Sequence, residues 1–420
     1  MPVGQGVRRG LKLPMDKTVP DTAKLRRALN APMLTLYGLG VTVGAGIYVL
    51  VGATAGQAGL YAPVAFLIAA TVVAFTAFSY AELSTRYPVS AGEAAYIEAG
   101  FRQNWLTTLV GLAVAASGII SASAVSIGAA SYLHPLTGIA QPILTVGVVA
   151  TMALVALWGI TQSVTVAGVI TVIEIGGLAF VIYWGFGVAD PSGVTVSDMI
   201  PPLSGAHWAG IGSGALLAFF AFVGFEDMAN VAEEVKDPTR TMPRAIIWTL
   251  VLATLIYVTT MVAVLIAVPL DQLATSAAPL ALVFEGASPR IQQMFGLIAV
   301  VATINGVLIQ MIMASRVIYG LADRGHLPAT FATVSHRTQT PVIATLCVAA
   351  IIMVLTLTVP IEALAARTSQ VVLTIFVLVN VALITLKHRG PPMVAYFRVP
   401  LIVPYLGVTT SVLLLTTSFL

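Results

Sequence analysis

The stretch LTLYGLGVTVGAGIY, residues 34–48, is an apolar segment interrupted by four glycines. Its composition is that of a membrane-spanning helix, but glycine weakens a helix, and Gly44 and Gly46 predict a break near its middle. In a bilayer, backbone groups that are not paired within a helix are tolerated only where they line a cavity or are buried in protein. The stretch therefore predicts a broken helix beside an internal site.

A second stretch, FFAFVGFED at residues 219–227, repeats this pattern, with Gly224 inside an apolar segment at membrane depth. Paired interrupted helices, one near the start of each half of a polytopic protein, are the best sequence indication of a transporter's substrate site. The two breaks together favour a secondary transporter.

The composition excludes most other classes of protein. Apolar residues make up 58% of the 420 residues and charged residues 9%, whereas a soluble domain carries about 25% charged residues. A single cysteine, Cys347, excludes an internal disulfide framework and a multi-cysteine metal site. The net charge of +3 does not indicate nucleic acid as a partner, because the basic residues follow the membrane topology.

Runs of roughly 20 apolar residues predict eleven membrane-spanning helices. With the amino terminus inside, every Lys and Arg except Arg290 and Arg367 falls in an inner segment. This bias predicts a multi-pass protein of the cytoplasmic membrane with its amino terminus inside. The predicted spans cover residues 33–56, 61–86, 104–132, 141–159, 164–189, 209–231, 244–268, 294–321, 341–359, 368–386 and 400–420.

The spans form two sets of five, so the sequence predicts an all-α polytopic membrane protein with an internal repeat. An odd number of helices places the second set upside down relative to the first, as an inverted repeat requires. The break falls in the first helix of each set, which makes helices one and six discontinuous. The expected organisation is a tail at 1–32, the first repeat at 33–189, the second at 209–386 and an additional helix at 397–420.

The first break predicts a site for a carboxylate. The amides of Gly44, Ala45, Gly46 and Ile47 would begin a half-helix, and a helix amino terminus attracts anions through free N–H groups and a partial positive charge. Ala45 has no hydroxyl, so the backbone alone would hold the carboxylate. The alternative is close helix packing, for which small residues are common in membranes.

The second break predicts the partner for a substrate ammonium. Carbonyls freed around Ala221 to Val223 would accept its hydrogen bonds, and the ring of Phe220 would close over the ligand. Glu226 is expected to be functional, because a carboxylate within a span is costly unless it is paired, hydrated or protonated. Asp227 points about 100° away on a helix and is expected to be a structural or gating group.

Three motifs carry a resemblance to a known family. Residues 219–226 with 232–238 and 241–246 resemble the sixth-helix signature of the amino acid–polyamine–organocation superfamily. Residues 79–83 with 86–93 resemble its second-to-third-helix signature, and residues 314–320 with Gly325, Leu327, Pro328, Thr340 and Pro341 resemble the end of its eighth helix and the loop that follows. The match runs in order across nearly the whole chain.

The resemblance implies the inverted five-helix repeat of the leucine-transporter-like fold, with an amino acid held between helices one and six. By position, Phe220 matches the family's gating aromatic residue and Glu226 its pathway acid. Cationic members often carry an acid or amide in the third helix, where this chain offers serines such as Ser121; small or neutral substrates are therefore favoured. The expected substrate site comprises Thr42, Gly44, Ala45, Gly46, Ile47, Ser121, Phe220, Ala221, Val223 and Glu226, with Asn305 and Asp227 along the pathway.

Glu174 lies in the middle of the fifth span, where proton-coupled relatives often carry a lysine. Burial disfavours its charged form, so it can gain and lose a proton within a transport cycle. Two alternatives stay open: a sodium ion at this position, and a permanently protonated glutamate bonded to a neighbour. Glu82, near the inner end of the second span, is expected to pair with a base there.

These observations predict an amino acid importer that works by alternating access with proton symport. The alternatives are an importer or exchanger of a cationic amino acid or polyamine, with Glu226 facing the second ammonium, and a sodium-coupled symporter. A membrane enzyme would need clustered nucleophile, base or metal-ligand residues, and the sequence has none of these clusters. A channel is disfavoured by the two-halves pattern. No cofactor or metal is expected.

Overall fold

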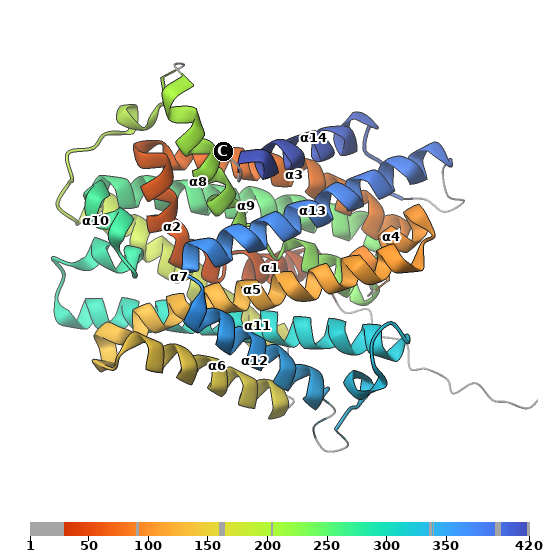
Figure 1. Ribbon diagram of the computed structural model, residues 1–420. Coiled ribbons are helices and arrows are strands. Elements are labelled where there is room, and N and C mark those ends of the chain that lie inside the picture. The colour runs from red at the N-terminus through yellow and green to blue at the C-terminus, as the bar shows by residue number, and fades with distance from the viewer. Residues whose placement is uncertain are drawn as a thin grey trace, which may run out of the picture.

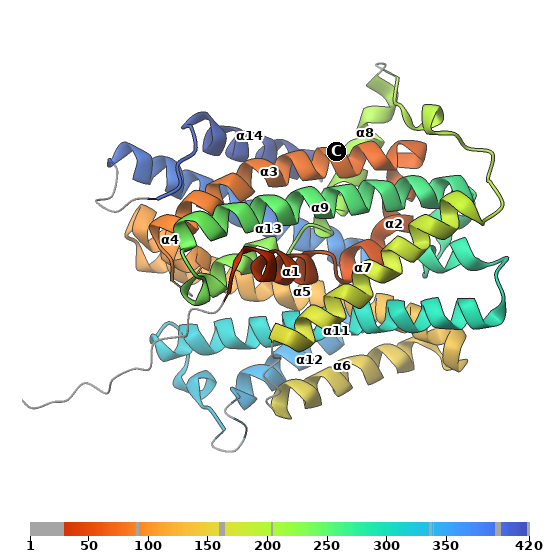
Figure 2. The same cartoon turned by 180° about the vertical axis from the view of Figure 1, so that it is seen from behind.

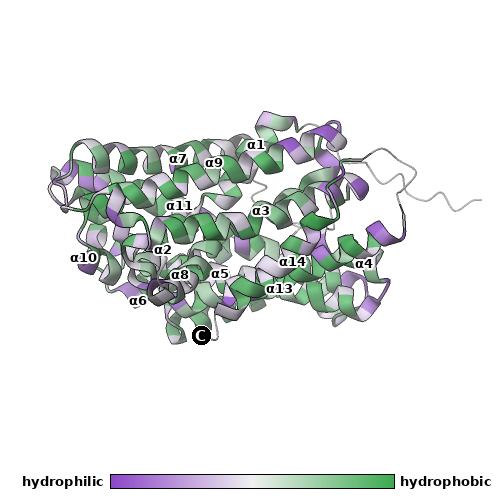
Figure 3. Cartoon of the chain, turned by 90° about the horizontal axis from the view of Figure 1, so that it is seen from above, coloured by the Kyte–Doolittle hydropathy of each residue, from purple (hydrophilic) through white to green (hydrophobic). Residues whose placement is uncertain are grey.

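The structure is a computed structural model that describes residues 29–89, 92–158, 164–202, 205–335, 338, 340–390 and 396–417. Most of the predicted tail at 1–32 lies outside these residues. Long helices run side by side along one common direction (Figures 1 and 2), and hydrophilic residues gather mainly at the two ends of the bundle (Figure 3). The described residues form no strand beyond one isolated bridge between Leu29 and Val235.

The α-helices are α1 (Ala31–Thr42), α2 (Ala45–Ala58), α3 (Ala62–Arg86), α4 (Gly92–Phe101), α5 (Asn104–Thr137), α6 (Gln141–Trp158), α7 (Val164–Gly187), α8 (Trp208–Phe220), α9 (Pro238–Ala267), α10 (Leu270–Thr275), α11 (Pro289–Asp323), α12 (Val342–Thr358), α13 (Ile361–His388) and α14 (Ile402–Thr416). Short 3₁₀ helices are η1 (Gly59–Tyr61), η2 (Val196–Met199), η3 (Gly205–His207), η4 (Phe225–Glu234), η5 (Pro279–Phe284) and η6 (Ala329–Ala332).

The all-helical membrane architecture agrees with the sequence. Within the described ranges, 8 helical stretches are long and apolar enough to cross a membrane. One of them, Gly46–Arg86, runs from α2 through η1 and α3 and so contains parts of two predicted spans. Val342–Thr358 and Ile402–Thr416 are shorter apolar helices at the ninth and eleventh predicted spans. Each predicted span therefore coincides with a helix or with the two halves of a broken one.

The structure differs from the prediction in two of the segments between spans and at the starts of several spans. The segment after α3 contains the ten-residue helix α4, and the segment after α9 contains α10. Three spans are also longer at their starts than hydropathy alone predicts, because α9 begins at Pro238, α11 at Pro289 and α13 at Ile361. Polar first turns do not end a helix when proline at the first positions fits the helical backbone, as in α11.

The chain before α1 is bound to the chain after η4. The amide of Leu29 donates to the carbonyl of Glu234 at 3.0 Å, and the amide of Lys236 donates to the carbonyl of Leu29 at 2.8 Å. The side chain of Leu29 is buried. The beginning of α1 and the end of η4 are thereby joined at the same end of the bundle.

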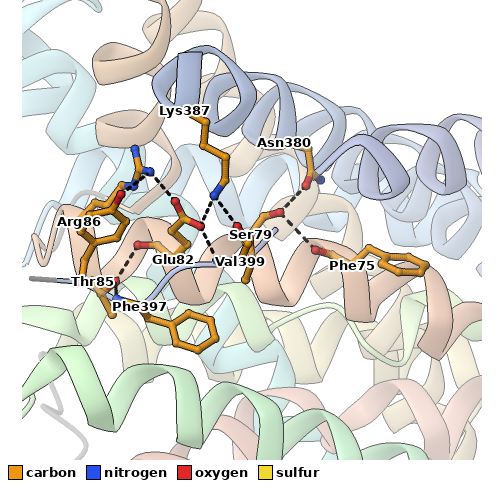
Figure 4. A network of polar contacts seen from close by, with 10 residues as sticks. Phe75, Ser79, Glu82, Thr85, Arg86, Asn380, Lys387, Phe397 and Val399 are labelled. Atoms are coloured by element: carbon orange, nitrogen blue, oxygen red, sulfur yellow. Dashed lines mark hydrogen bonds and ion pairs between the residues drawn. The ribbon is translucent and has the colours of Figure 1, made fainter. Parts of the chain in front are cut away.

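A buried carboxylate joins α3, α13 and the segment before α14 (Figure 4). Glu82, fully buried on α3, lies 2.5 Å from Nη2 of Arg86 and 2.6 Å from Nζ of Lys387 on α13. It also accepts a hydrogen bond from the amide of Val399 at 2.8 Å. The expectation that Glu82 pairs with a base is thus confirmed, and it pairs with two.

One turn earlier, an uncharged set of hydrogen bonds joins the same two helices. The hydroxyl of Ser79 donates to Oδ1 of Asn380 at 2.6 Å, and Nδ2 of Asn380 donates to the hydroxyl of Thr76 at 2.9 Å. Asn380 is thus an interhelical hydrogen-bonding residue of the kind that small polar side chains form in membranes. Together with Glu82 it fixes α13 against α3.

We expect Glu82→Gln to destabilise the protein by about 3–5 kcal/mol, because two buried cations lose their carboxylate. The matched control is Asp237→Asn, which removes the charge of an exposed pair with Arg240, whose side chains are 56% and 78% exposed. That control should cost less than about 1 kcal/mol. Unfolding monitored in detergent measures both variants, and equal losses would show that Glu82 does not bind the helices together.

Candidate functional site

The first break separates α1 from α2. α1 ends at Thr42, Val43 caps it, and α2 begins at Ala45 directly after Gly44. The break therefore lies one to two residues earlier than the predicted start of the half-helix near Ile47, and Gly46 belongs to the first turn of α2. Among the described residues no side chain caps α2 at its amino terminus, although Thr42, Gly44 and Gly46 are buried.

This geometry leaves buried donors at the start of α2. The first N–H groups of an α-helix have no acceptor within the helix and require a side chain, water or ligand. A Cβ at Gly44 would make an ordinary van der Waals contact with the carbonyl oxygen of Gly40, at 3.5 Å, so close packing does not require glycine at this position. The sequence-based hypothesis assigns a carboxylate to the amides of Gly44 to Ile47, which begin α2.

The second break follows α8. α8 ends at Phe220, residues 221–224 form a turn, and η4 continues from Phe225. Gly224 adopts φ 119°, a left-handed conformation that favours glycine. A Cβ at Gly224 would also lie 2.7 Å from the carbonyl oxygen of Val41 in α1. Glycine is therefore required both by the backbone conformation and by the close approach of the first broken helix.

The two breaks contact each other. A Cβ at Gly46 would lie 2.7 Å from Cα of Ala221, so only glycine allows the backbones of α2 and the second break to come this close. Close packing therefore accounts for glycine at Gly46, whereas a Cβ at Gly44 would make only an ordinary contact. The candidate binding residues of both stretches lie side by side, although about 175 residues separate them in the chain.

The hydroxyl of Tyr257 joins the two breaks. It lies 2.6 Å from the carbonyl oxygen of Thr42 and 2.8 Å from that of Ala221, so its one hydrogen, donated from α9, is shared between these two acceptors. The ring is fully buried and packs edge-on against Phe222, with 5.0 Å between centroids. Sequence analysis missed Tyr257, since a tyrosine in an apolar helix carries no local signal of the carbonyls it will contact.

Two of the three phenylalanines at residues 219–222 pack against other aromatic rings, and Phe220 does not. Phe219 packs against Phe376 with 5.6 Å between ring centroids, and Phe222 packs against Tyr257. Phe220 is buried, with 3% of its surface exposed, and has no aromatic neighbour in the described part of the chain. Phe220 therefore differs from Phe219 and Phe222 in making no ring contact with another aromatic residue of the described part of the chain.

Beyond the second break, three carboxyl groups surround a small cavity. Glu226 and Asp227 come from η4, and Glu93 from α4. The cavity has a volume of about 20 Å³, enough for one water and too small for an amino acid. Val223 of the second break lines the same cavity, so the carboxyl groups lie beside that break.

Each of these carboxyl groups has a neutral donor. Oε2 of Glu226 accepts from the amide of Gly224 at 2.9 Å. Oε1 of Glu93 accepts from the hydroxyl of Tyr80 at 3.0 Å, and Oδ1 of Asp227 accepts from Nδ2 of Asn230 at 3.4 Å. Among the described residues, no cation is a donor to these three carboxyl groups.

The cavity also shows what sequence analysis missed. Glu93, Tyr80 and Gln310 line it, and so does Ser117 rather than the predicted Ser121. Ser121 is buried one turn further along the same face of α5. Glu93 belongs to the second-to-third-helix motif, which lies between two predicted spans. Because this segment folds as α4, Glu93 lies beside the acids of η4.

Glu174 and Asn305, assigned separately from the sequence to coupling and to the pathway, contact each other. Nδ2 of Asn305 on α11 donates to Oε1 of Glu174 on α7 at 3.1 Å. Oε2 of Glu174 is buried and has no hydrogen-bond partner in the described residues. A buried oxygen in this state is satisfied by a proton of its own carboxyl group or by a bound cation.

Two tyrosines connect Glu174 with the first break. The hydroxyl of Tyr48 donates to the carbonyl oxygen of Glu174 at 2.6 Å, and the hydroxyl of Tyr132 on α5 donates to the carbonyl oxygen of Tyr48 at 2.6 Å. Tyr48 is the fourth residue of α2. The helix whose first amides border the candidate substrate site thus also contacts the backbone of the candidate coupling residue.

Comparison with known proteins identifies the family. A family model described as amino acid permease matches residues 31–420. The chain belongs to the amino acid permease family. The suspected superfamily is thus confirmed, and the protein is a multi-pass membrane protein whose family and relatives are transporters, not enzymes.

Relatives of this permease differ in the substrates their names state. It is 28% identical over 400 residues to the branched-chain amino acid permease BcaP of Bacillus subtilis (strain 168), covering 90% of this chain and 84% of that protein. It is 30% identical over 392 residues to the mitochondrial cationic amino acid transporter 3 of Arabidopsis thaliana, covering 88% of this chain and 64% of that protein. It is 28% identical over 402 residues to the methylthioribose transporter of Bacillus subtilis (strain 168), covering 90% of this chain and 85% of that protein.

We expect Tyr257→Phe to separate the two breaks while keeping the ring in place. Loss of the hydroxyl removes the donor to two buried carbonyls and should lower stability by about 1–3 kcal/mol. The control is Tyr183→Phe, whose ring is 66% exposed and which should change little. Thermal unfolding of the purified permease measures both, and equal effects would mean that the hydroxyl of Tyr257 does not hold the breaks together.

Proposed function

We propose that this permease is a secondary active transporter that moves amino acids across the cytoplasmic membrane by alternating access around the two breaks. The supporting observation is that the broken helices meet, with Gly46 against Ala221 and Tyr257 bonded to both. Broken helices in corresponding positions of two halves support an inverted five-helix repeat, α1–α7 followed by α8–α13, with the amino terminus inside.

The substrate lies between the breaks with its two charged groups on opposite sides. Its carboxylate accepts hydrogen bonds from the backbone amides at the start of α2, which has no side-chain cap among the described residues. These amides belong to Gly44, Ala45, Gly46 and Ile47. Its ammonium donates to carbonyls between Ala221 and Val223. The carbonyl of Ala221 retains a second lone pair beside the hydroxyl of Tyr257.

The remaining proposed roles follow from the same placement. Phe220 closes over the ligand, because its neighbours in the run are engaged in ring packing. Thr42 contributes the backbone that Tyr257 holds in place. Ser121 lies on α5, on the side of the substrate side chain, and the small serine favours small or neutral side chains.

A second candidate function is transport of cationic amino acids or polyamines. The observation that favours it is the cavity with Glu93, Glu226 and Asp227, none of which receives a cation among the described donors. A second ammonium of such a substrate would find three acceptors there.

Flux of labelled amino acids into proteoliposomes tests the proposal directly. We expect amino acids to compete with the labelled substrate, while the corresponding amides and decarboxylated amines compete at least about tenfold more weakly, since they lack the carboxylate that α2 binds. Equal competition by decarboxylated amines would overturn the carboxylate site and favour polyamines.

Glu174 is the proposed coupling residue, with a proton on the oxygen that has no hydrogen-bond partner. Glu174→Gln keeps the contact with Asn305 and mimics the protonated state. We expect this variant to exchange substrate across the membrane but to lose accumulation driven by a pH gradient. Asn305→Ala, which removes the donor and keeps the carboxyl group, should retain a response to the pH gradient.

Two results would contradict this role of Glu174. Accumulation that needs sodium and ignores the pH gradient would make Glu174 a cation ligand. Normal accumulation by Glu174→Gln in a pH gradient would make it a permanently protonated structural residue.

A further inference from the structure

A large cleft opens at the α4 end of the bundle, apart from the breaks and from Glu174. Its volume is about 610 Å³, and three arginines from different segments line it: Arg86 at the end of α3, Arg102 after α4, and Arg389 after α13. Glu98 is the one carboxylate among the lining residues.

The buried network beside the cleft does not neutralise these arginines. Glu82 is shared by Arg86 and Lys387, so two cations face one carboxylate (Figure 4). Arg102 and Arg389 add two positive charges and Glu98 subtracts one. The cleft and its supporting network therefore carry an excess of positive charge, which an anion would balance.

Arg86 supplies a donor that lacks an acceptor. Its side chain is 4% exposed, and Nη2 contacts Glu82 and the hydroxyl of Tyr396. Nε is buried and has no hydrogen-bond partner within the described ranges. Arg86 therefore carries a costly donor without an acceptor among the described residues, and the same residue lines the cleft.

Arg102 is held in an unusual backbone conformation. It ends α4 with φ 56°, in the left-handed region that glycine or asparagine usually occupies after a helix. An arginine is a costly choice for the turn itself, so its side chain has another use. Arg389 is oriented toward the same segment, since its Nη1 donates to the carbonyl of Ala99 in α4 at 3.1 Å.

We propose that this cleft binds a phosphate group, such as that of an anionic phospholipid headgroup. Guanidinium groups match phosphate oxygens with paired donors, and basic pockets between helix ends are where membrane proteins bind anionic headgroups. Trp105, three residues after Arg102, is 65% exposed. Exposed tryptophan is typical of the level of the headgroups, which places the cleft within reach of lipid.

The test measures the melting temperature of the purified full chain in neutral detergent while short-chain phosphatidylglycerol is added. We expect stabilisation by phosphatidylglycerol and none by phosphatidylcholine of the same chain length. Arg102→Gln should weaken the apparent affinity for phosphatidylglycerol about fivefold, and Arg102→Lys should restore most of it. Arg290→Gln, at the first turn of α11 and the opposite end of the bundle, is the matched control and should bind like the wild type (Figure 1).

Inorganic phosphate is the second arm of the experiment. Stabilisation by inorganic phosphate without any by phosphatidylglycerol would keep the phosphate site and identify a soluble ligand. Equal stabilisation by both phospholipids, or equal weakening by Arg102→Gln and Arg290→Gln, would overturn the proposal, because neither depends on the arginines of the cleft.

Discussion

The need to satisfy backbone groups at membrane depth determines how this molecule is arranged. A helix that breaks inside a bilayer exposes N–H and C=O groups that lipid cannot bind. Here the two breaks pack against each other: the turn at Gly224 contacts Val41, and α2 contacts Ala221 at Gly46. The hydroxyl of Tyr257 lies within hydrogen-bond distance of one carbonyl oxygen from each break. The acceptors are thereby partly satisfied within the protein, while the first amides of α2 have no side-chain cap. In the proposed function, this asymmetry suits the junction of the breaks to the carboxylate of the substrate.

How much of this could be predicted from the sequence depends on how local each signal is. Apolar runs of sufficient length predicted the spans, and glycine within such runs predicted both breaks, because hydropathy and helix propensity act over a few residues. The start of α2 at Ala45 was predicted slightly too late, since glycine marks a weak point of a helix rather than its boundary. Tyr257 could not be predicted, because its acceptor at Thr42 is 215 residues away. Glu93 and Gln310 were missed for the same reason, as only the packing of α4 and α11 brings them to the cavity with Glu226.

The partners of the buried carboxylates separate structural groups from groups suited to transport. Glu82 receives two cations and a backbone amide, so its charge is compensated and it holds helices together. Glu174 receives only a neutral amide at one oxygen, and its other oxygen has no hydrogen-bond partner among the described residues. Glu226 accepts from a backbone amide. Sequence position alone did not distinguish these cases, because all three are acids within or beside apolar segments; the difference lies in what surrounds each carboxyl group.

On the proposed function, α2 provides a short physical link between substrate and coupling ion. Its first amides border the break, and Tyr48, its fourth residue, bonds to the backbone of Glu174. The carbonyl of Tyr48 is in turn fixed by Tyr132 of α5, so α2 cannot rotate about its axis without breaking two buried hydrogen bonds. A substrate carboxylate that accepts hydrogen bonds from the first turn of α2 therefore binds the same helix that contacts the backbone of Glu174. Because energetic coupling between two sites requires an element whose position both sites bias, α2 is the element in this fold that meets that requirement.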